Sequence, residues 1–345
     1  MRYRPPVTPK LLAGPLARFR ELPVWGRGTP LFELWVGAGA TAVATLLFGV
    51  FVWQGWAPLG EANHCLDTGK CYCEAFDRAA VQAGAPGVRQ HANTWSNLFP
   101  IVTGLGLALL CAWDRAGNRL ARSTQELTWG HWYPVIFMLI IGFMGPGSMF
   151  FHASMTHVGG LIDNLSMLLF VWFLLAYGVF VRAEGAQGAQ QDSAFWRAVR
   201  GRAVHQGRYG RFWAIFLVGV GVSMALLWAG FYRRGWGLAL IAPVALFPLV
   251  EGYRMLRGAR SVGRRTLAQS GLRSDKTRWF FAGGVVSFGV ALLTWGTGHQ
   301  AGEGLCQPHS WFQWHALWHV LANITAALLF LHFRGVELDY DPTTP

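Results

Sequence analysis

The chain has 345 residues, of which 53% are hydrophobic and only 13% are charged, and its formal net charge is +12. Soluble domains carry about 25% charged residues, so this composition excludes an ordinary soluble enzyme and favours a polytopic membrane protein. The basic residues lie in short clusters between apolar stretches, which indicates membrane topology and not a nucleic-acid-binding face. We therefore expect an all-α membrane helix bundle that binds no nucleic acid.

Eight segments are apolar enough to form membrane helices, since a bilayer core needs about 20 apolar residues per helix. The first, 32–53, follows a basic cytoplasmic segment, 1–31, as in a signal anchor. A long polar loop with cysteines, 54–94, comes next, and 183–210 is predicted to be a flexible linker. The remaining spans are expected at 95–113, 131–152, 162–182, 212–232, 235–253, 279–297 and 312–333, before a cytoplasmic tail, 334–345.

The distribution of basic residues predicts the orientation of these spans. With a cytoplasmic N-terminus, only five of the 29 basic residues fall in the opposite loops: Lys70, Arg78, Arg89, Arg233 and Arg234. Both termini are therefore predicted to be cytoplasmic. The cysteines agree, because four of them lie in outer loops, where disulfides persist. These are Cys65, Cys71, Cys73 and Cys306, and their number allows three connectivities.

Three histidines in the spans form the strongest candidate site, since ionisable groups inside a membrane are costly and usually functional. His315 and His319 are four residues apart, so they share one face of a helix, as in known two-histidine metal motifs. His152 ends the third span at the same predicted depth, near the extracytoplasmic interface. Three protein ligands with an open fourth position are typical of a catalytic zinc site. We predict that these histidines bind one zinc ion.

Two further polar residues are expected beside the metal. Ser148 precedes His152 by one helical turn, and Asp163 begins the fourth span, where it can hydrogen-bond a ligand or a bound water. Haem is the alternative for paired histidines, but neighbours on one helix face cannot occupy both axial positions, so haem would need two partner helices. Isolated histidines near an interface are common, and we interpret five in this way: His131, His157, His299, His309 and His332.

The order of these residues resembles the alkaline ceramidases, which belong to a superfamily of seven-span hydrolases that includes adiponectin/progestin-type receptors and lipid-remodelling proteins. The shared order is Ser148-x3-His152, an aspartate eleven residues later, and His315-x3-His319. Local similarity extends to Asn93-Thr-Trp-Ser-Asn97, Gly-Ser-Met-Phe-Phe-His and His-Ala-Leu-Trp-His. The resemblance covers about 71–333, so span 32–53 is an addition to a seven-helix catalytic core, 95–333.

The resemblance implies that the three histidines hold zinc, that Asp163 is the base and that Ser148 polarises the substrate carbonyl or stabilises the oxyanion. Asn93 and Asn97 would support the site. The implied reaction is zinc-dependent hydrolysis of the amide bond of ceramide, or of a related N-acyl lipid, by a zinc-activated water. Two alternatives stay open: a zinc-containing lipid receptor of the adiponectin-receptor type, and an ester lipase that differs only in the scissile bond.

The chain departs from the family at a calcium site that precedes the first family span. The family has Asp-Trp-Cys-Glu-x-Asn and an upstream Glu, whereas this chain reads Cys71-Tyr-Cys-Glu-Ala-Phe76 and has Gln90 at the upstream position. Glu74 is kept and Asp77 is a shifted substitute, but calcium needs several oxygen ligands, so we do not expect an intact site. The resemblance also pairs Cys73 with Cys306, which leaves Cys65 to pair with Cys71.

Overall fold

A computed structural model describes residues 32–63, 72–116, 133–178, 194–229, 243–244, 246–253, 273–300 and 305–338. Across these ranges the protein is all-helical, as predicted, apart from one isolated bridge between Ala62 and Thr156. Six of the described helices are long and apolar enough to cross a membrane, and the apolar part of another, Phe212–Trp228, is shorter. The predicted span 235–253 is described only in part, where residues 246–253 are helical. The composition of these helices makes this a multi-pass membrane protein.

The helices follow the predicted order, with some displaced ends. They are α2 (Phe32–Gln54), α3 (Arg78–Gln82), α4 (His91–Trp95), α5 (Leu98–Ala116), α7 (Tyr133–Ser154), α8 (His157–Ala176), α10 (Ala194–Trp228), α12 (Arg273–Gln300) and α13 (Trp314–Leu338). Helix α8 begins earlier than predicted because the Thr156 side chain caps it by accepting the Gly159 N–H. Helix α10 begins inside the segment 183–210, so that part of the predicted linker is helical.

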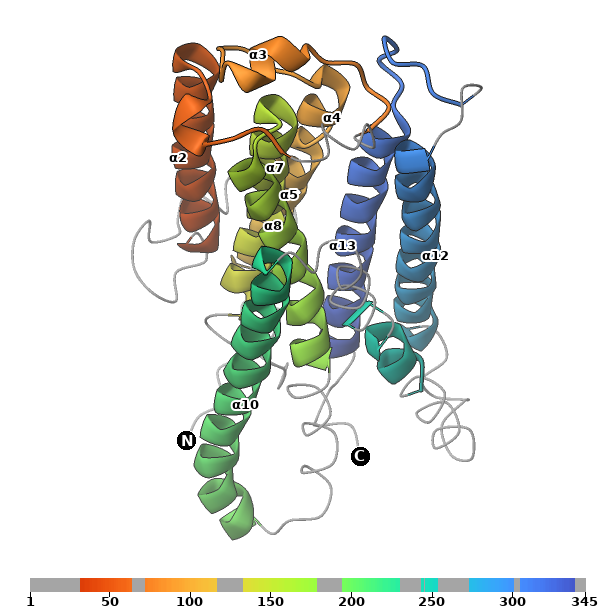
Figure 1. Cartoon of the computed structure of the whole chain (residues 1–345). Coiled ribbons are helices and arrows are strands. Elements are labelled where there is room, and N and C mark those ends of the chain that lie inside the picture. The colour runs from red at the N-terminus through yellow and green to blue at the C-terminus, as the bar shows by residue number, and fades with distance from the viewer. Residues whose placement is uncertain are drawn as a thin grey trace, which may run out of the picture.

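Helices that are neighbours in sequence pack side by side, and α12 pairs with α13 (Figure 1). Helix α2, the N-terminal addition, lies at one edge against α5 and α7. The short helices α3 and α4 lie at one end of the bundle (Figure 1), and α4 contacts α13. The C-terminal turn of α7 and the N-terminal turns of α8 and α13 meet at this same end.

Helix α2 is anchored to the bundle by an aromatic cluster. Trp56, which is 1% exposed, stacks on Phe51 with ring centroids 5.7 Å apart and contacts Phe150 of α7 edge-on. Its indole N–H donates to the Gly87 carbonyl at 2.7 Å. The neighbouring backbone turn needs Gly84, which has φ +57° and would place a Cβ only 2.7 Å from backbone atoms of Ala57.

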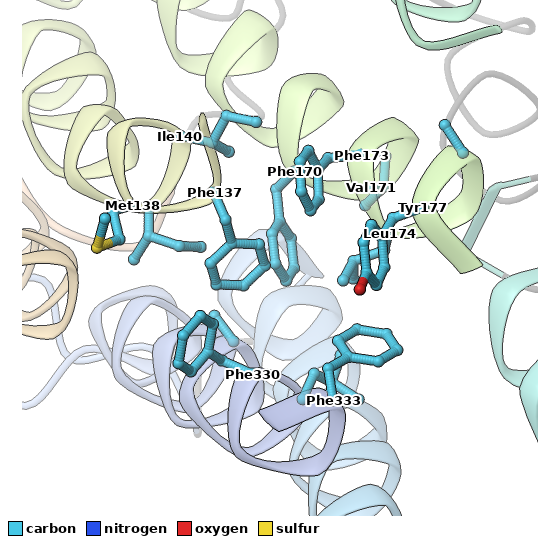
Figure 2. Close-up of a cluster of buried hydrophobic side chains, with 14 of the residues drawn as sticks. Phe137, Met138, Ile140, Phe170, Val171, Phe173, Leu174, Tyr177, Phe330 and Phe333 are labelled. Carbon is cyan, nitrogen blue, oxygen red and sulfur yellow. The ribbon is translucent and has the colours of Figure 1, made fainter. Parts of the chain in front are cut away.

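The centre of the bundle is filled by aromatic side chains, shown in Figure 2. We call this cluster the aromatic core and define it by Phe137 of α7, Phe173 and Tyr177 of α8 and the turn that follows it, and Phe330 and Phe333 of α13. Phe137 and Phe330 have ring centroids 5.4 Å apart, and Tyr177 meets Phe333 edge-on at 5.2 Å. This packing sets the relative positions of the three helices that carry the candidate site.

Candidate metal centre

The sequence Gly145-Pro-Gly-Ser148 near the end of α7 lets neighbouring helices approach closely. A Cβ at Gly145 would lie 2.7 Å from the Asn97 carbonyl oxygen, at the start of α5. A Cβ at Gly147 would lie 3.1 Å from the Ser166 side chain of α8. Both contacts flank Ser148, so the glycines bring α5 and α8 against the face of α7 that carries Ser148 and His152.

The three predicted histidines come together in one buried cluster. His152 is fully buried, and His315 and His319 are 3% and 5% exposed. One ring nitrogen of each lies within 4.8 Å of the other two, and the Nε2 atoms of His152 and His315 are 3.2 Å apart. Nitrogen ligands at about 2.0–2.1 Å from a tetrahedral zinc lie roughly 3.3 Å from one another. The cluster therefore has the donor type and spacing to hold a metal ion.

Gln90, which immediately precedes α4, orients the ring of His152. Its Oε1 accepts a hydrogen bond from His152 Nδ1 at 2.7 Å, and its Nε2 donates to the Glu74 carbonyl at 3.2 Å. Because a carbonyl oxygen only accepts, the contact with Glu74 fixes which end of the Gln90 amide faces the histidine. His152 Nδ1 then carries the hydrogen, and the lone pair of Nε2 is available to a metal.

His319 is held in the same way by the residues between α4 and α5. Its Nδ1 lies 2.8 Å from Ser96 Oγ and 3.1 Å from Asn97 Nδ2. The Ser96 hydroxyl donates to the Asn93 carbonyl, so its oxygen accepts from His319 Nδ1. The Asn97 amide also donates to the Asn93 carbonyl at 2.7 Å. Asn93 and Asn97, predicted as supporting residues, therefore lie beside this ligand.

Ser148 and Asp163 form a pair next to the cluster. The Ser148 side chain hydrogen-bonds the Asp163 carboxylate, and its Oγ lies 3.4 Å from His319 Nε2. Both residues are buried, at 4% and 7% exposed. With His319, Asn97 and Asn323 they line a pocket between α5, α7, α8 and α13. A hydroxyl, a carboxylate and an imidazole thus converge on one small space inside the bundle.

An outer segment, residues 72–75, covers the histidines. The Tyr72 ring lies over His315 with centroids 3.7 Å apart and over His152 at 4.9 Å. The next residue, Cys73, is bonded to Cys306, as the resemblance implied. The Ala75 N–H donates to the Pro308 carbonyl at 2.9 Å. The disulfide and this hydrogen bond therefore attach the segment to the residues that lead into α13. The other two cysteines, Cys65 and Cys71, lie outside the described residues.

One comparison with known proteins decides the family. The family model described as Ceramidase matches residues 86–344, which is most of the chain and includes every histidine of the cluster. The chain belongs to the Ceramidase family. No protein with a curated description matches it. Helix α2 and the outer segment precede the residues that match the Ceramidase model.

The two carboxylates at the positions compared above with the family's calcium site both accept backbone hydrogen bonds. Glu74 accepts the backbone N–H groups of Ala92 and Asn93 at 2.6 and 2.9 Å, at the start of α4. Asp77 caps α3 by accepting from Ala79 and Ala80. Burial raises the pKa of Glu74, against the lowering effect of those N–H groups. These residues fit calcium poorly, because Glu74 and Asp77 already accept backbone N–H groups and Gln90 supplies no charge.

The prediction that the three histidines lie together is confirmed, but some of their hydrogen-bond partners were missed. Gln90 was noted only as a departure from the calcium site, yet it is the acceptor for His152 Nδ1. Ser96 lay unassigned within the Asn93–Asn97 motif, and it contacts His319. Asn323 was overlooked, although its place four residues after His319 puts it on the same helix face. A polar residue on the histidine face of an apolar helix was the signal that could have found it.

Proposed function

We propose that this protein is a zinc-dependent amidohydrolase that cleaves the amide bond of ceramide, or of a related N-acyl lipid. The observation that carries the proposal is the cluster of three imidazoles, one of which, His319, lines the same pocket as the Ser148–Asp163 pair. Membership of the Ceramidase family supports the substrate class. The pocket lies between apolar helices, which suits a substrate whose acyl chain stays in the membrane.

Zinc is the metal that the donor set favours. Three neutral imidazole nitrogens suit zinc, whereas calcium and magnesium prefer several oxygen ligands. Among the described residues, the cluster of His152, His315 and His319 contains no fourth protein ligand. Such a three-ligand set is typical of catalytic and not of structural zinc. When bound, zinc supplies Lewis acidity to a carbonyl and lowers the pKa of water.

The chain's own residues supply the proton transfers. Asp163 is positioned to accept a proton from the attacking water and to return it to the leaving amine, the usual work of a buried carboxylate in hydrolysis. Ser148 has one hydroxyl hydrogen, which it shares between Asp163 and the space beside His319. Turned toward that space, it donates to the carbonyl oxygen as negative charge develops there.

We further propose that both termini are cytoplasmic and that the site faces the extracytoplasmic side. The uneven distribution of basic residues supports this orientation. The Cys73–Cys306 disulfide beside the site also supports it, since disulfides persist on the oxidising side of a membrane. In intact cells, an antibody should reach an epitope tag at the C-terminus of the protein only after the membrane has been permeabilised. Labelling of the tag without permeabilisation would contradict a cytoplasmic C-terminus.

The direct test is hydrolysis by purified protein. Wild type in detergent should release fatty acid from ceramide, and His315→Ala and Asp163→Ala should lose this activity. His309→Ala is the matched control, because this exposed histidine lies at the same end of the bundle outside the cluster. Wild-type protein that contains stoichiometric zinc but cleaves no N-acyl or ester lipid would disprove the enzymatic proposal.

A further inference from the structure

Asn323 carries a buried hydrogen-bonding atom that the protein itself does not use. The residue lies on α13, four residues after His319, and is 2% exposed. Its Nδ2 donates to the His319 carbonyl at 2.6 Å. No donor in the described part of the chain lies within hydrogen-bond distance of its Oδ1. Leaving a buried acceptor unsatisfied costs about 1–3 kcal/mol, so such an atom calls for an explanation.

The orientation of the Asn323 amide follows from its contacts. The His319 carbonyl can only accept a hydrogen bond, so the atom facing it must be the amide nitrogen. The oxygen is therefore the end of the amide left without a partner. Asn323 lines the same pocket as Ser148, Asp163 and His319. An unused acceptor thus lies at the wall of the pocket that contains the proposed catalytic groups.

Other polar side chains of this pocket donate hydrogen bonds to the backbone. Ser166 donates its hydroxyl hydrogen to the Asp163 carbonyl at 2.7 Å, and the Asn97 amide donates to Asn93. The Asn323 amide is likewise directed at His319, so one hydrogen of each of these three side chains goes to a backbone oxygen. Among the described residues that line this pocket, Asn323 Oδ1 is therefore a buried acceptor that no protein donor satisfies.

We propose that Asn323 Oδ1 accepts a hydrogen bond from a donor that the substrate carries beside its scissile carbonyl. The inference rests on the proposed hydrolysis and narrows its substrate class. An N-acyl amino alcohol has such donors in its amide N–H and its hydroxyl groups. A lipid ester has no N–H at the scissile bond and leaves the acceptor unsatisfied. Asn323 is thus a specificity-determining residue that favours N-acyl lipids over esters.

The experiment measures kcat/KM for three substrates with wild type and with each variant. The substrates share one acyl chain: ceramide, the analogue without its hydroxyl groups, and the analogue with an ester oxygen in place of the N–H. The hydrogen bond should contribute about tenfold to a hundredfold to the preference of wild type for ceramide over the analogue that lacks the relevant donor. In Asn323→Leu the ratio of kcat/KM for ceramide to that for this analogue should therefore fall by about the same factor, while zinc content is unchanged. The analogue for which this kcat/KM ratio changes in Asn323→Leu shows whether the donor is the N–H or a hydroxyl group.

Asn164→Leu is the matched control, because Asn164 Nδ2 makes the same type of bond to a carbonyl four residues earlier, Gly160 at 2.7 Å, and does not line the pocket. Its selectivity ratio should stay at the wild-type value. Equal losses on every substrate in Asn323→Leu, or an unchanged ratio, would overturn the inference. Asn323→Ala gives the same readout if the leucine variant does not fold.

The role of Asn323 can also be judged without hydrolysis. Ceramide should raise the unfolding temperature of wild type more than the donor-free analogues do, and Asn323→Leu should abolish that difference. Wild-type protein that binds in this selective way but hydrolyses nothing would disprove the proposed function and keep the inference. Hydrolysis of ceramide with a selectivity that does not depend on Asn323 would keep the proposed function and disprove the inference.

Discussion

Helices α7, α8 and α13 run through two regions of the molecule that are held together in different ways. At one end lies the polar end, which we define as Gln90–Asn97, Ser148–His152, Asp163 and His315–His319. Here buried side chains are fixed by directed hydrogen bonds, such as Gln90 to His152 and Ser96 to His319. Farther along the helices lies the aromatic core, where Phe137, Phe330 and their neighbours pack by shape (Figure 2).

The difference shows where the protein depends on single atoms. A hydrogen bond in a buried site requires one particular geometry. Replacing one partner leaves the other unsatisfied and changes the orientation of the side chain that the bond held. Aromatic packing spreads its energy over many weak contacts, so a residue of similar volume is tolerated. We therefore expect substitutions in the polar end to affect function, and substitutions in the aromatic core to affect stability alone.

The largest expected effect is on catalysis, from Asp163→Asn. The change keeps the shape of the side chain and removes its capacity to accept a proton, so kcat/KM should fall about 10²- to 10⁴-fold. Zinc content and the unfolding temperature should remain close to wild type. Asp77→Asn makes the same chemical change at the exposed cap of α3 and should keep full activity. Retained activity in Asp163→Asn would remove this residue from the mechanism.

A volume change in the aromatic core should produce the opposite pattern. Phe330→Ala leaves a cavity, and at roughly 24 cal/mol per Å³ the lost packing should cost about 2 kcal/mol of stability. That loss should occur even in a lipid environment, where transfer from water adds nothing. Unfolding curves in detergent measure it, with Phe330→Leu as the milder control. A loss of zinc from the folded variant would contradict the separation of the two regions.

Gln90→Leu sharpens the comparison, because it removes one acceptor and no ligand. Without Oε1 to receive its hydrogen, His152 is free to rotate or to change tautomer, so zinc affinity should fall about 10- to 100-fold. Competition with a chelator measures this affinity. Gln82→Leu, on the exposed end of α3, is the matched control. If both variants bind zinc as wild type does, His152 does not depend on Gln90.

The smallest expected effect is a pH dependence from Glu74. Burial raises its pKa in the folded protein above the ordinary value of 4.5, so the folded state binds this proton more tightly than the unfolded state. Its stabilising contribution is complete below the ordinary value and is lost as pH rises through the folded pKa. Wild type should therefore lose more stability than Glu74→Gln when unfolding is compared at pH 4.5 and pH 7.5. Equal losses in both proteins would contradict this.

Much of the polar end follows from the sequence, because its ligands lie on regular elements. The four-residue spacing of His315 and His319 fixes a common face, and the predicted topology places His152 at their depth. The length of the apolar stretches likewise predicts the membrane helices. The start of α8 is missed because Met155 adopts φ 55°, a left-handed conformation rare for methionine, and so lets the chain turn directly to the Thr156 cap.

The partners of the ligands are harder to foresee, because they depend on contacts between distant segments. Gln90 and His152 are 62 residues apart, and no local pattern pairs them. The hydrogen bonds that Glu74 accepts from the first backbone N–H groups of α4 also join segments that no local pattern pairs. Only the three-dimensional arrangement shows that these side chains hold the segments together by buried hydrogen bonds.

The zinc content of purified protein tests the central claim most directly. Elemental analysis of wild type should give one zinc per chain, and His315→Ala should lose it while His309→Ala retains it. Wild type without stoichiometric zinc after purification free of chelator, or His315→Ala with its zinc intact, would contradict the assignment of His152, His315 and His319 as the metal ligands.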